Sequence, residues 1–364
     1  MLDINDRIYV AGHNGMVGSA LVRHLKAYGC RHIITRSRQA LDLTAQGAVQ
    51  QFFSAEKIDA VFLAAARVGG VNANNTFRAD FIYENLMIEA NVIHQAFAAG
   101  VRRLLFLGSS CIYPRAVAQP MREEALLTGT LEPTNEPYAI AKISGIKMCE
   151  AYNAQHRTAY RAVMPTNLFG PNDNYDLETS HVLPAIIRKL HLAKSACAGD
   201  VDTVLNDERA YGRIPEDVRV CLDALFEDNG HPALFKTAAD NRPEQFGIAV
   251  WGSGKPLREF LHVDDMAAAC LFAMQLEDEV FTKMMTDDGI SFLNVGSGRE
   301  ISIYDLVNLV AKVVGYPGDI LWDASHPDGI SRKLLDTTRL KQLGWRPAIS
   351  LEEGIRQVYR DYCR

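Results

Sequence analysis

Residues 8–18 read Ile-Tyr-Val-Ala-Gly-His-Asn-Gly-Met-Val-Gly, a short apolar run that leads into three glycines, each three residues after the last. A helical pattern follows, since Val17, Leu21 and Leu25 fall on one face. Glycines between a strand and a helix permit a tight turn and let the backbone approach a pyrophosphate, which then meets free N–H groups at the helix N-terminus. The stretch therefore predicts a dinucleotide-binding turn rather than a plain one.

The rest of the first half alternates apolar strands with helices. We expect strands at residues 32–35, 59–66, 104–107 and 162–164, with helices between them, one of which carries Tyr138 and Lys142. This alternation predicts an α/β fold with a Rossmann-like, doubly wound parallel sheet. Residues 1–170 are accordingly predicted to form the dinucleotide-binding domain.

Beyond about residue 170 the pattern becomes irregular. Short strands at 249–251 and 292–295 mix with helices. Ser302 and Ser350 are predicted to be the N-caps of two further helices. We expect residues 171–364 to form mainly a smaller α/β substrate-binding lobe, with some segments returning to the main sheet. An acidic stretch near 195–245, with an amphipathic helix at 215–227, is interpreted as a surface insertion; a lid or a subunit contact is the alternative.

The composition narrows the classes of function. A net charge of −6 and the absence of a long basic run disfavour nucleic acid as a partner. Seven scattered cysteines without a CxxC pair indicate reduced thiols in a cytoplasm and no structural metal site. The N-terminus lacks the features of a signal peptide, and no apolar run is long enough for a membrane span.

The end of the second expected strand indicates which dinucleotide is bound. Sites for NAD usually place a carboxylate there, but this chain reads Thr35-Arg36-Ser37-Arg38 and has no acid before Asp42. Arg36 or Arg38 can clamp a 2′-phosphate, so NADPH is predicted; two solvated loop arginines are the alternative. Asp42 and Leu43 follow, where they can flank the adenine.

Three residues in the same half suggest the reduction of a carbonyl. Tyr138 and Lys142 lie four apart on one helix, and the ammonium is expected to lower the pKa of the phenol. Ser109, at the end of the strand at 104–107, can hydrogen-bond the same substrate oxygen. Together they form a proton-donating site for a developing alkoxide.

The order GxxGxxG, strand-end Ser and YxxxK resembles the extended short-chain dehydrogenase/reductase family. More narrowly, the blocks GHNGMVGSALVRHL, GSSCIYP, EPYAIAK, PTNLFGPNDNY, SHVLPAIIRK, WGSGKPLREFLHVDD and PDGISRKLLD are similar to the GDP-L-fucose synthase family. The resemblance runs over nearly the whole chain except the stretch near 195–245. It implies an enzyme that epimerises GDP-4-keto-6-deoxy-D-mannose at carbons 3 and 5 and reduces carbon 4 with NADPH, in a family whose members are usually homodimers.

The resemblance also assigns residues to roles. Cys111 and His181 become the acid/base pair of the epimerisations, although Cys111 alone would be interpreted as a buried structural thiol and His181 alone as an ordinary loop histidine. Cofactor contacts fall on Gly12, His13, Asn14, Gly15, Met16, Val17, Gly18, Arg36, Arg38, Asp42, Leu43, Leu107, Gly108, Lys142, Pro165, Thr166, Asn167, Leu168 and His181. The stretch from Pro165 to Leu168 is expected to be a loop beside the nicotinamide.

Substrate contacts fall on Lys189, Trp251, Arg258, Asp328 and Lys333. Two alternatives stay open here, because Trp251 can be a core residue and Arg258 can pair with Asp264 or Asp265. One position departs from the family, which has an arginine where this chain has Lys189, next to Arg188. Lysine keeps the charge but loses the planar fork, so either Lys189 makes a point contact or Arg188 replaces it.

Other functions remain as alternatives. An enzyme for a related GDP-4-keto-sugar, such as a 3,6-dideoxy sugar, would use the same scaffold. A 4,6-dehydratase expects an Asp-Glu pair where this chain has Ser110 and Cys111. A non-catalytic NADP(H) sensor would not need Tyr138 and Lys142.

Overall fold

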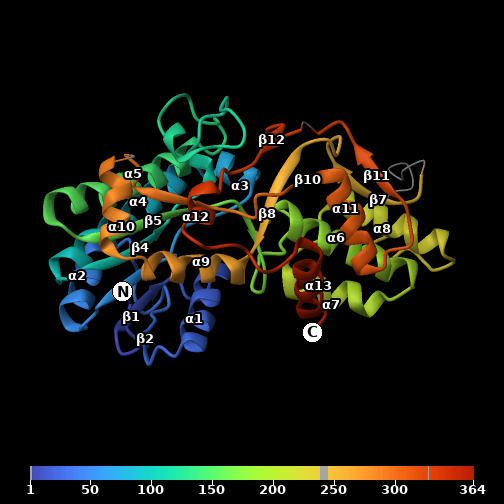
Figure 1. Cartoon of the computed structure of the whole chain (residues 1–364). Coiled ribbons are helices and arrows are strands. Elements are labelled where there is room, and N and C mark those ends of the chain that lie inside the picture. The colour runs from blue at the N-terminus through green and yellow to red at the C-terminus, as the bar shows by residue number, and fades with distance from the viewer. Residues whose placement is uncertain (1, 238–244, 288, 327) are drawn as a thin grey trace. The chain divides into compact units, whose positions relative to one another are not determined.

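The computed structural model describes residues 2–237, 245–287, 289–326 and 328–364. The chain divides into two compact units (Figure 1). Unit 1 comprises Met1–Asn172, Glu259–Arg299 and Lys333–Ser350, and unit 2 comprises Asp173–Arg258, Glu300–Arg332 and Leu351–Arg364. Each unit is therefore assembled from segments that are far apart in the sequence.

A six-stranded parallel sheet forms the centre of unit 1, in the order β2-β1-β3-β4-β5-β9. Its strands are β1 (Arg7–Ala11), β2 (His32–Ile34), β3 (Ala60–Leu63), β4 (Arg103–Leu107), β5 (Ala159–Pro165) and β9 (Phe292–Val295). Every central strand is buried on both faces, as a sheet covered by helices on both sides requires. This doubly wound sheet confirms the predicted fold class.

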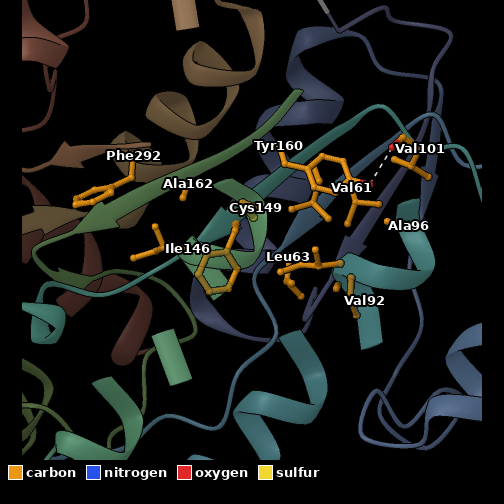
Figure 2. Packing of buried hydrophobic residues seen from close by; sticks show 14 of the residues in the cluster. Val61, Leu63, Val92, Ala96, Val101, Ile146, Cys149, Tyr160, Ala162 and Phe292 are labelled. Carbon is orange, nitrogen blue, oxygen red and sulfur yellow. Dashed lines mark hydrogen bonds between the residues drawn. The ribbon is translucent and has the colours of Figure 1, made fainter. Parts of the chain in front are cut away.

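Helices cover both faces of the sheet. Helix α1 (Met16–Tyr28) packs with α9 (Val263–Gln275), and their apolar residues share one core cluster with Ile8, Val10 and Phe62. Helices α2 (Gln46–Ala55), α4 (Arg78–Ala98) and α5 (Glu136–His156) contribute to a second cluster. Figure 2 shows part of that cluster, including the Tyr160 hydroxyl, which donates a 3.0 Å hydrogen bond to the Val101 carbonyl.

The buried side of α4 is not purely apolar. Ile82, Leu86 and Ala90 are only partly buried, whereas Phe81, Asn85 and Glu89 are buried together with Val92, Ile93 and Ala96. The Asn85 amide accepts from the Arg67 N–H and donates to the carbonyls of Arg67 and Phe81, so its burial is fully compensated. This face of α4 therefore brings a carboxylate, Glu89, into the interior of unit 1.

Short elements complete unit 1: α3 (Val71–Thr76), η1 (Ser110–Ile112), η2 (Glu123–Ala125), α10 (Asp278–Asp287) and α12 (Thr338–Gln342). The expected loop at Pro165–Leu168 is wrong. Pro165 ends β5, and residues Asn167–Phe169 form strand β6, which pairs in parallel with Phe260, Leu261 and His262 of β8 (Leu257–His262). Because β8 comes much later in the chain, local sequence gave no sign of this pairing.

Unit 2 is built around helix α6 (Val182–Cys197), against which α7, α8 and α11 pack. Its other elements are α7 (Val201–Tyr211), α8 (Glu216–Asp228), β7 (Ile248–Trp251), β10 (Glu300–Ser302), α11 (Ile303–Val314), β11 (Ile320–Asp323) and α13 (Leu351–Tyr362). Of the two residues of β12 (Arg332–Lys333), Arg332 belongs to unit 2 and Lys333 to unit 1. Strands β7 and β11 pair in parallel, and Ser302 caps α11 by accepting from the Asp305 N–H at 3.0 Å.

The stretch near 195–245 contains α7, α8 and the end of α6. The helix predicted at 215–227 is confirmed as α8, with Pro215 as its N-cap. Val218, Leu222 and Phe226 are buried, so α8 is part of the packing of unit 2. Residues 238–244 of the expected insertion lie outside the described residues.

All seven cysteines lie in the described part of the chain and are free thiols. Within the same residues, no group of three or more His, Cys, Asp or Glu side chains could hold a metal ion. Likewise, none of the described helices has both the length and the apolar character that a membrane span requires.

Candidate active site

The three glycines of the turn after β1 differ in backbone conformation and in the space that a side chain would have. Gly12 has φ +83°, and a Cβ there would lie 2.7 Å from the Ala65 nitrogen. A Cβ on Gly18 would overlap the carbonyl of Gly12, so α1 packs directly on the turn only because Gly18 has no side chain. A Cβ on Gly15 would meet only the Gly12 oxygen, at an ordinary 3.5 Å. Gly12 and Gly18 thus shape the turn, whereas Gly15 leaves open space above it.

The N-terminus of α1 is open to an anion. Gly15 is the N-cap and has no side chain to satisfy the first N–H groups, which belong to Met16, Val17 and Gly18. The Nδ1 atom of His13, in the same turn, is buried with no hydrogen-bond partner among the described residues. Unpaired donors at the positive end of a helix suit the pyrophosphate of a dinucleotide, so these residues fit the predicted cofactor.

Arg36 and Arg38 differ in how free their side chains are to bind a 2′-phosphate. Arg36 donates to the Thr35 carbonyl, pairs with Glu56 at 2.6 Å and lies over the Phe52 ring. The Arg38 side chain is 74% exposed and reaches Glu84 only at 3.3 Å. Arg38 is therefore the freer of the two for a 2′-phosphate.

Asp42 and Leu43 follow in a tight turn. The Asp42 carboxylate accepts from the Thr44 N–H and hydroxyl, and these bonds lower its pKa. The Leu43 side chain packs on the core, and its carbonyl accepts from the Asn91 amide at 2.9 Å.

The end of β4 positions the first catalytic candidates. Leu107 is its last residue, and a Cβ on Gly108 would overlap the Met164 side chain, so the chain turns at a glycine against β5. Ser109 then caps η1, its hydroxyl accepting from the Cys111 N–H at 3.4 Å. Ser109 also lowers the pKa of the Tyr138 hydroxyl and that of the Cys111 thiol, so its hydroxyl lies near both groups. The expected proton donor and the expected epimerisation thiol therefore share one neighbouring hydroxyl.

Tyr138 and Lys142 lie on the buried side of α5, with the Lys142 Nζ 5.7 Å from the centre of the Tyr138 ring. Nζ donates to the Leu107 carbonyl at 3.0 Å and lies 3.0 Å from Oε1 of Glu89. The expected lowering of the Tyr138 pKa is wrong for this structure. Burial raises that pKa well above its usual value, and Cys111 and Glu89 raise it further, while Ser109 lowers it. A carboxylate beside Lys142 offsets the ammonium on which the expectation relied.

Cys111 is buried, and burial raises the pKa of its thiol. Lys333, Ser109 and Lys142 act in the opposite direction without overcoming burial. Lys333 belongs to unit 1, whereas the four other predicted substrate residues belong to unit 2. The thiol is therefore in its protonated form at neutral pH and is suited to donate a proton.

Thr166 and Asn167 are both held by β8. The Thr166 hydroxyl and the Asn167 amide donate to the same Glu259 carbonyl, at 3.2 and 2.8 Å. Leu168 packs against the core cluster that α1 and α9 share. The segment expected beside a nicotinamide is thus a fixed strand edge rather than a loop.

Unit 2 contains His181 and four predicted substrate residues. His181 is exposed and is the N-cap of α6. Lys189 donates to the Ala249 carbonyl at 3.2 Å, and its Nζ lies 5.2 Å from the centre of the Trp251 ring. Trp251 is 52% exposed, so it is not a core residue. Its ring stacks on His326 at 4.3 Å, and its Nε1 donates to Asp217 of α8 at 3.3 Å.

Arg258 and Asp328 lie at the start of β8 and after β11. Asp328 accepts from the Ser253 N–H and hydroxyl, and Arg258 donates to the Leu257 carbonyl at 2.8 Å. The alternative pairing of Arg258 is wrong, because Asp264 pairs with Arg23 at 2.6 Å and Asp265 accepts from the N–H groups of Ala348 and Ile349.

Arg188 does not replace Lys189 as a substrate contact. Its side chain is fully buried, pairs with Asp207 at 2.7 Å and donates to the carbonyls of Tyr175, Tyr211 and Gly212. Asp207 also accepts from the Tyr362 hydroxyl. Arg188 is therefore a structural residue that ties α6 to α7, and Lys189 is the remaining cation at this position.

Comparison with known proteins places this arrangement in a family. The model of the NAD dependent epimerase/dehydratase family matches residues 8–235 and 225–284. The chain belongs to this family. GDP-L-fucose synthase from Escherichia coli is 49% identical over 97% of this chain and 95% of its own, and putative GDP-L-fucose synthase 2 from Arabidopsis thaliana is 48% identical over 100% and 93%. A solved GDP-6-OMe-4-keto-L-xylo-heptose reductase from C. jejuni is 36% identical, with a TM-score of 0.87 over 100% of this chain and 99% of its own.

Sequence reasoning missed three polar residues around the site of this family member: Glu89 beside Lys142, and Asp217 and His326 beside Trp251. Glu89 had a detectable signal, because it falls four residues after Asn85 and four before Ile93 on what proves to be the buried face of α4. Asp217 and His326 had none, because they reach Trp251 from α8 and from the residues after β11.

Proposed function

We propose that this chain converts GDP-4-keto-6-deoxy-D-mannose into GDP-L-fucose, by epimerisation at carbons 3 and 5 and reduction at carbon 4 with NADPH. The observation that carries the proposal is the Ser109 hydroxyl, which accepts from the Cys111 N–H and lowers the pKa of both Tyr138 and Cys111. A reductase needs only the tyrosine, whereas a thiol at the same point adds a group that can protonate a neighbouring carbon. The full-length similarity to GDP-L-fucose synthases supports the same chemistry.

The glycine turn and the N-terminus of α1 would hold the pyrophosphate of NADPH, and Arg38 its 2′-phosphate. NADPH supplies a hydride when it is bound. Lys142 donates a hydrogen bond to the Leu107 carbonyl and pairs with Glu89, and its ammonium has three hydrogens, so one remains for a ribose hydroxyl even if each of these contacts takes one.

In the reduction, the carbonyl carbon gains the hydride and its oxygen gains a proton. Tyr138, which its raised pKa keeps protonated, donates that proton as general acid. Ser109 hydrogen-bonds the same oxygen and stabilises the charge that develops on it. Tyr138 is left as a phenolate that must recover a proton from solvent before the next turnover.

In the epimerisations, the keto group acidifies the hydrogens on carbons 3 and 5. A base removes a proton from one face of the sugar and an acid returns one to the opposite face, so no net oxidation occurs. We assign Cys111 as the acid, because burial keeps its thiol protonated, and His181 as the base. Lys189, Trp251, Arg258, Asp328 and Lys333 would bind the nucleotide-sugar, with Arg258 suited to the diphosphate.

A second candidate is the same chemistry on another GDP-4-keto-sugar. Lys189 stands where the resembled family has arginine, and the C. jejuni reductase for a GDP-4-keto-heptose is structurally similar over the whole chain. A lysine ammonium cannot make the two parallel hydrogen bonds of an arginine guanidinium, so the exchange would change which hydroxyl or phosphate oxygen of the substrate is bound.

The test is to incubate the protein with NADPH and each of several GDP-4-keto-sugars and to identify the products by NMR. GDP-L-fucose formed with the highest kcat/KM supports the proposal. A larger kcat/KM for a heptose or a 3,6-dideoxy substrate would favour the second candidate. NADPH binding without turnover of any of them would indicate a sensor and contradict both.

The cellular setting is also part of the proposal. Seven free thiols suit a reducing cytoplasm, where NADPH is available. Homodimer formation is proposed on the resemblance, and the partly exposed apolar residues of α4, together with exposed Tyr83, offer a surface for it.

A further inference from the structure

Glu89 is a buried carboxylate beside the catalytic lysine. Its side chain is 1% exposed and that of Lys142 is 3% exposed, and Oε1 lies 3.0 Å from Nζ. Neither oxygen of Glu89 accepts a well-formed hydrogen bond from the described residues. Removing a carboxylate from water costs several kcal/mol in free energy, so a position whose sole compensation is one lysine is costly for folding.

Three described groups of α5 interact electrostatically with Glu89. They are Lys142, Tyr138 and Cys149, which lie along the face of α5 that packs on α4. Lys142 is held from three directions: by the Leu107 carbonyl, by Glu89 and by the Phe106 ring, whose centre is 4.7 Å from Nζ. The ammonium therefore has one defined position, and Glu89 fixes one side of it.

We infer that Glu89 is a positioning residue for the Tyr138–Lys142 pair, which it serves by fixing the Lys142 ammonium and by keeping Tyr138 in its proton-bearing form. The inference rests on the proposed function, because only a reductase needs Tyr138 protonated before hydride arrives. The Glu89 charge itself raises the Tyr138 pKa, so removing the carboxylate would lower that pKa and favour the phenolate.

Glu89 itself titrates in the relevant range. Burial raises its pKa to about 7, and the Lys142 charge only partly reverses this rise. Above about pH 7 the carboxylate is ionised and opposes the Lys142 charge, whereas below that pH it gains a proton and the opposition is lost. The protonation state of Glu89 thus affects the pKa of Tyr138, which the ionised carboxylate raises.

The test compares Glu89→Gln with the wild type in the pH dependence of kcat for the keto reduction. The isosteric amide removes the charge and keeps the shape. The basic limb of the profile is expected to move to lower pH by roughly one unit. Glu89→Asp, which keeps the charge at a longer distance, should move it less. The matched control is Glu150→Gln, a surface residue of α5 that pairs with Lys147, and it should leave the limb in place.

A second readout needs no turnover. NMR titration of protein labelled at the tyrosine Cζ carbon, with Tyr138→Phe to assign the signal, should show a lower Tyr138 pKa in the Glu89→Gln variant with NADP+ bound. If the wild type turns over no keto-sugar, the proposed function fails and the NMR titration still decides the role of Glu89.

The inference is overturned if Glu89→Gln reduces kcat equally at every pH, or lowers Tm while both the limb and the Tyr138 titration stay where they are in the wild type. Should the Gln variant fail to fold, Glu89→Asp decides: a profile and a titration identical to the wild type would contradict the inference.

Discussion

Arg188 and Lys189 are adjacent in the sequence but differ in burial and in the contacts that they make. Arg188 is fully buried and ion-paired with Asp207, whereas Lys189 faces Trp251. Arg188→Met should lower the free energy of unfolding by about 3–5 kcal/mol, because it leaves Asp207 buried without its cation. Lys189→Met should change stability by less than about 1 kcal/mol and raise KM for the GDP-sugar. Denaturant unfolding and steady-state kinetics separate the two; a large stability loss in the Lys189 variant would contradict the assignment.

Arg38 determines the preference for NADPH in this account. Arg38→Ala removes one charge-assisted contact to a phosphate and should weaken NADPH binding by roughly ten- to a hundredfold, with little effect on NADH. Cofactor fluorescence titrations measure both constants. Arg36→Ala is the matched comparison, since Arg36 is occupied by Glu56. Equal losses for NADPH and NADH in the Arg38 variant would place the 2′-phosphate elsewhere.

At the residue scale, sequence reasoning found motifs but not their electrostatic surroundings. Tyr138 and Lys142 are recognisable because helical spacing alone makes them neighbours. The spacing of Glu89 from Asn85 and Ile93 was a signal for its place on α4, but a single acidic residue in a helix usually faces solvent, and nothing in the sequence paired it with Lys142. Its burial depends on how α4 packs against α5, which is tertiary information, and this packing also reversed the expected direction of the Tyr138 pKa.

The turn between β1 and α1 can be tested as an element. Gly18→Ala places a Cβ on the Gly12 carbonyl, where only backbone could move, so both Tm and NADPH binding should fall. Gly15→Ala meets that carbonyl at an ordinary 3.5 Å and should keep Tm near that of the wild type while weakening NADPH. Thermal unfolding with and without NADPH measures both effects. Near-normal Tm in the Gly18 variant would show that the close packing of α1 is not required.

Elements with local signals were predicted well and those with distant partners were not. The helix at 215–227 and the strand at 292–295 follow from apolar periodicity and appear as α8 and β9. The segment at Pro165–Leu168 looked like a loop, because a proline ends the apolar run. Its strand character comes from pairing with β8, which no local pattern reveals.

At the scale of the whole molecule, buried carboxylates make stability depend on pH. Burial raises the pKa of Glu123 from 4.5 to about 7, even though it accepts from the Asn294 N–H. The folded state thus binds this proton more tightly than the unfolded state. The resulting stability is fully present below about pH 4.5 and is lost as pH rises to about 7.

Glu123→Gln keeps an acceptor for Asn294 and cannot ionise. We compare the free energy of unfolding of the wild type with that of this variant. The difference, wild type minus variant, should fall by up to about 3 kcal/mol as the pH rises from about 4.5 to about 7. Urea unfolding across the range measures the difference. A constant difference would mean that Glu123 keeps an ordinary pKa in the folded protein.

The division into two units was only partly accessible to sequence reasoning. Residues 1–170 were expected to form one domain; unit 1 comprises Met1–Asn172 together with Glu259–Arg299 and Lys333–Ser350. The last segment includes Lys333, which acts electrostatically on Cys111 of the same unit. Such exchange of segments depends on non-local strand pairing and is invisible to periodicity.

The central claim is that one site combines epimerisation with reduction. The most direct test is to incubate the protein with GDP-4-keto-6-deoxy-D-mannose and NADPH in deuterated water and to locate the label by NMR. The account predicts GDP-L-fucose that carries deuterium at carbons 3 and 5, and loss of that label when Cys111 is replaced by Ser. NADPH consumption that yields a product without solvent label would make the protein a plain reductase and contradict the roles of Cys111 and His181.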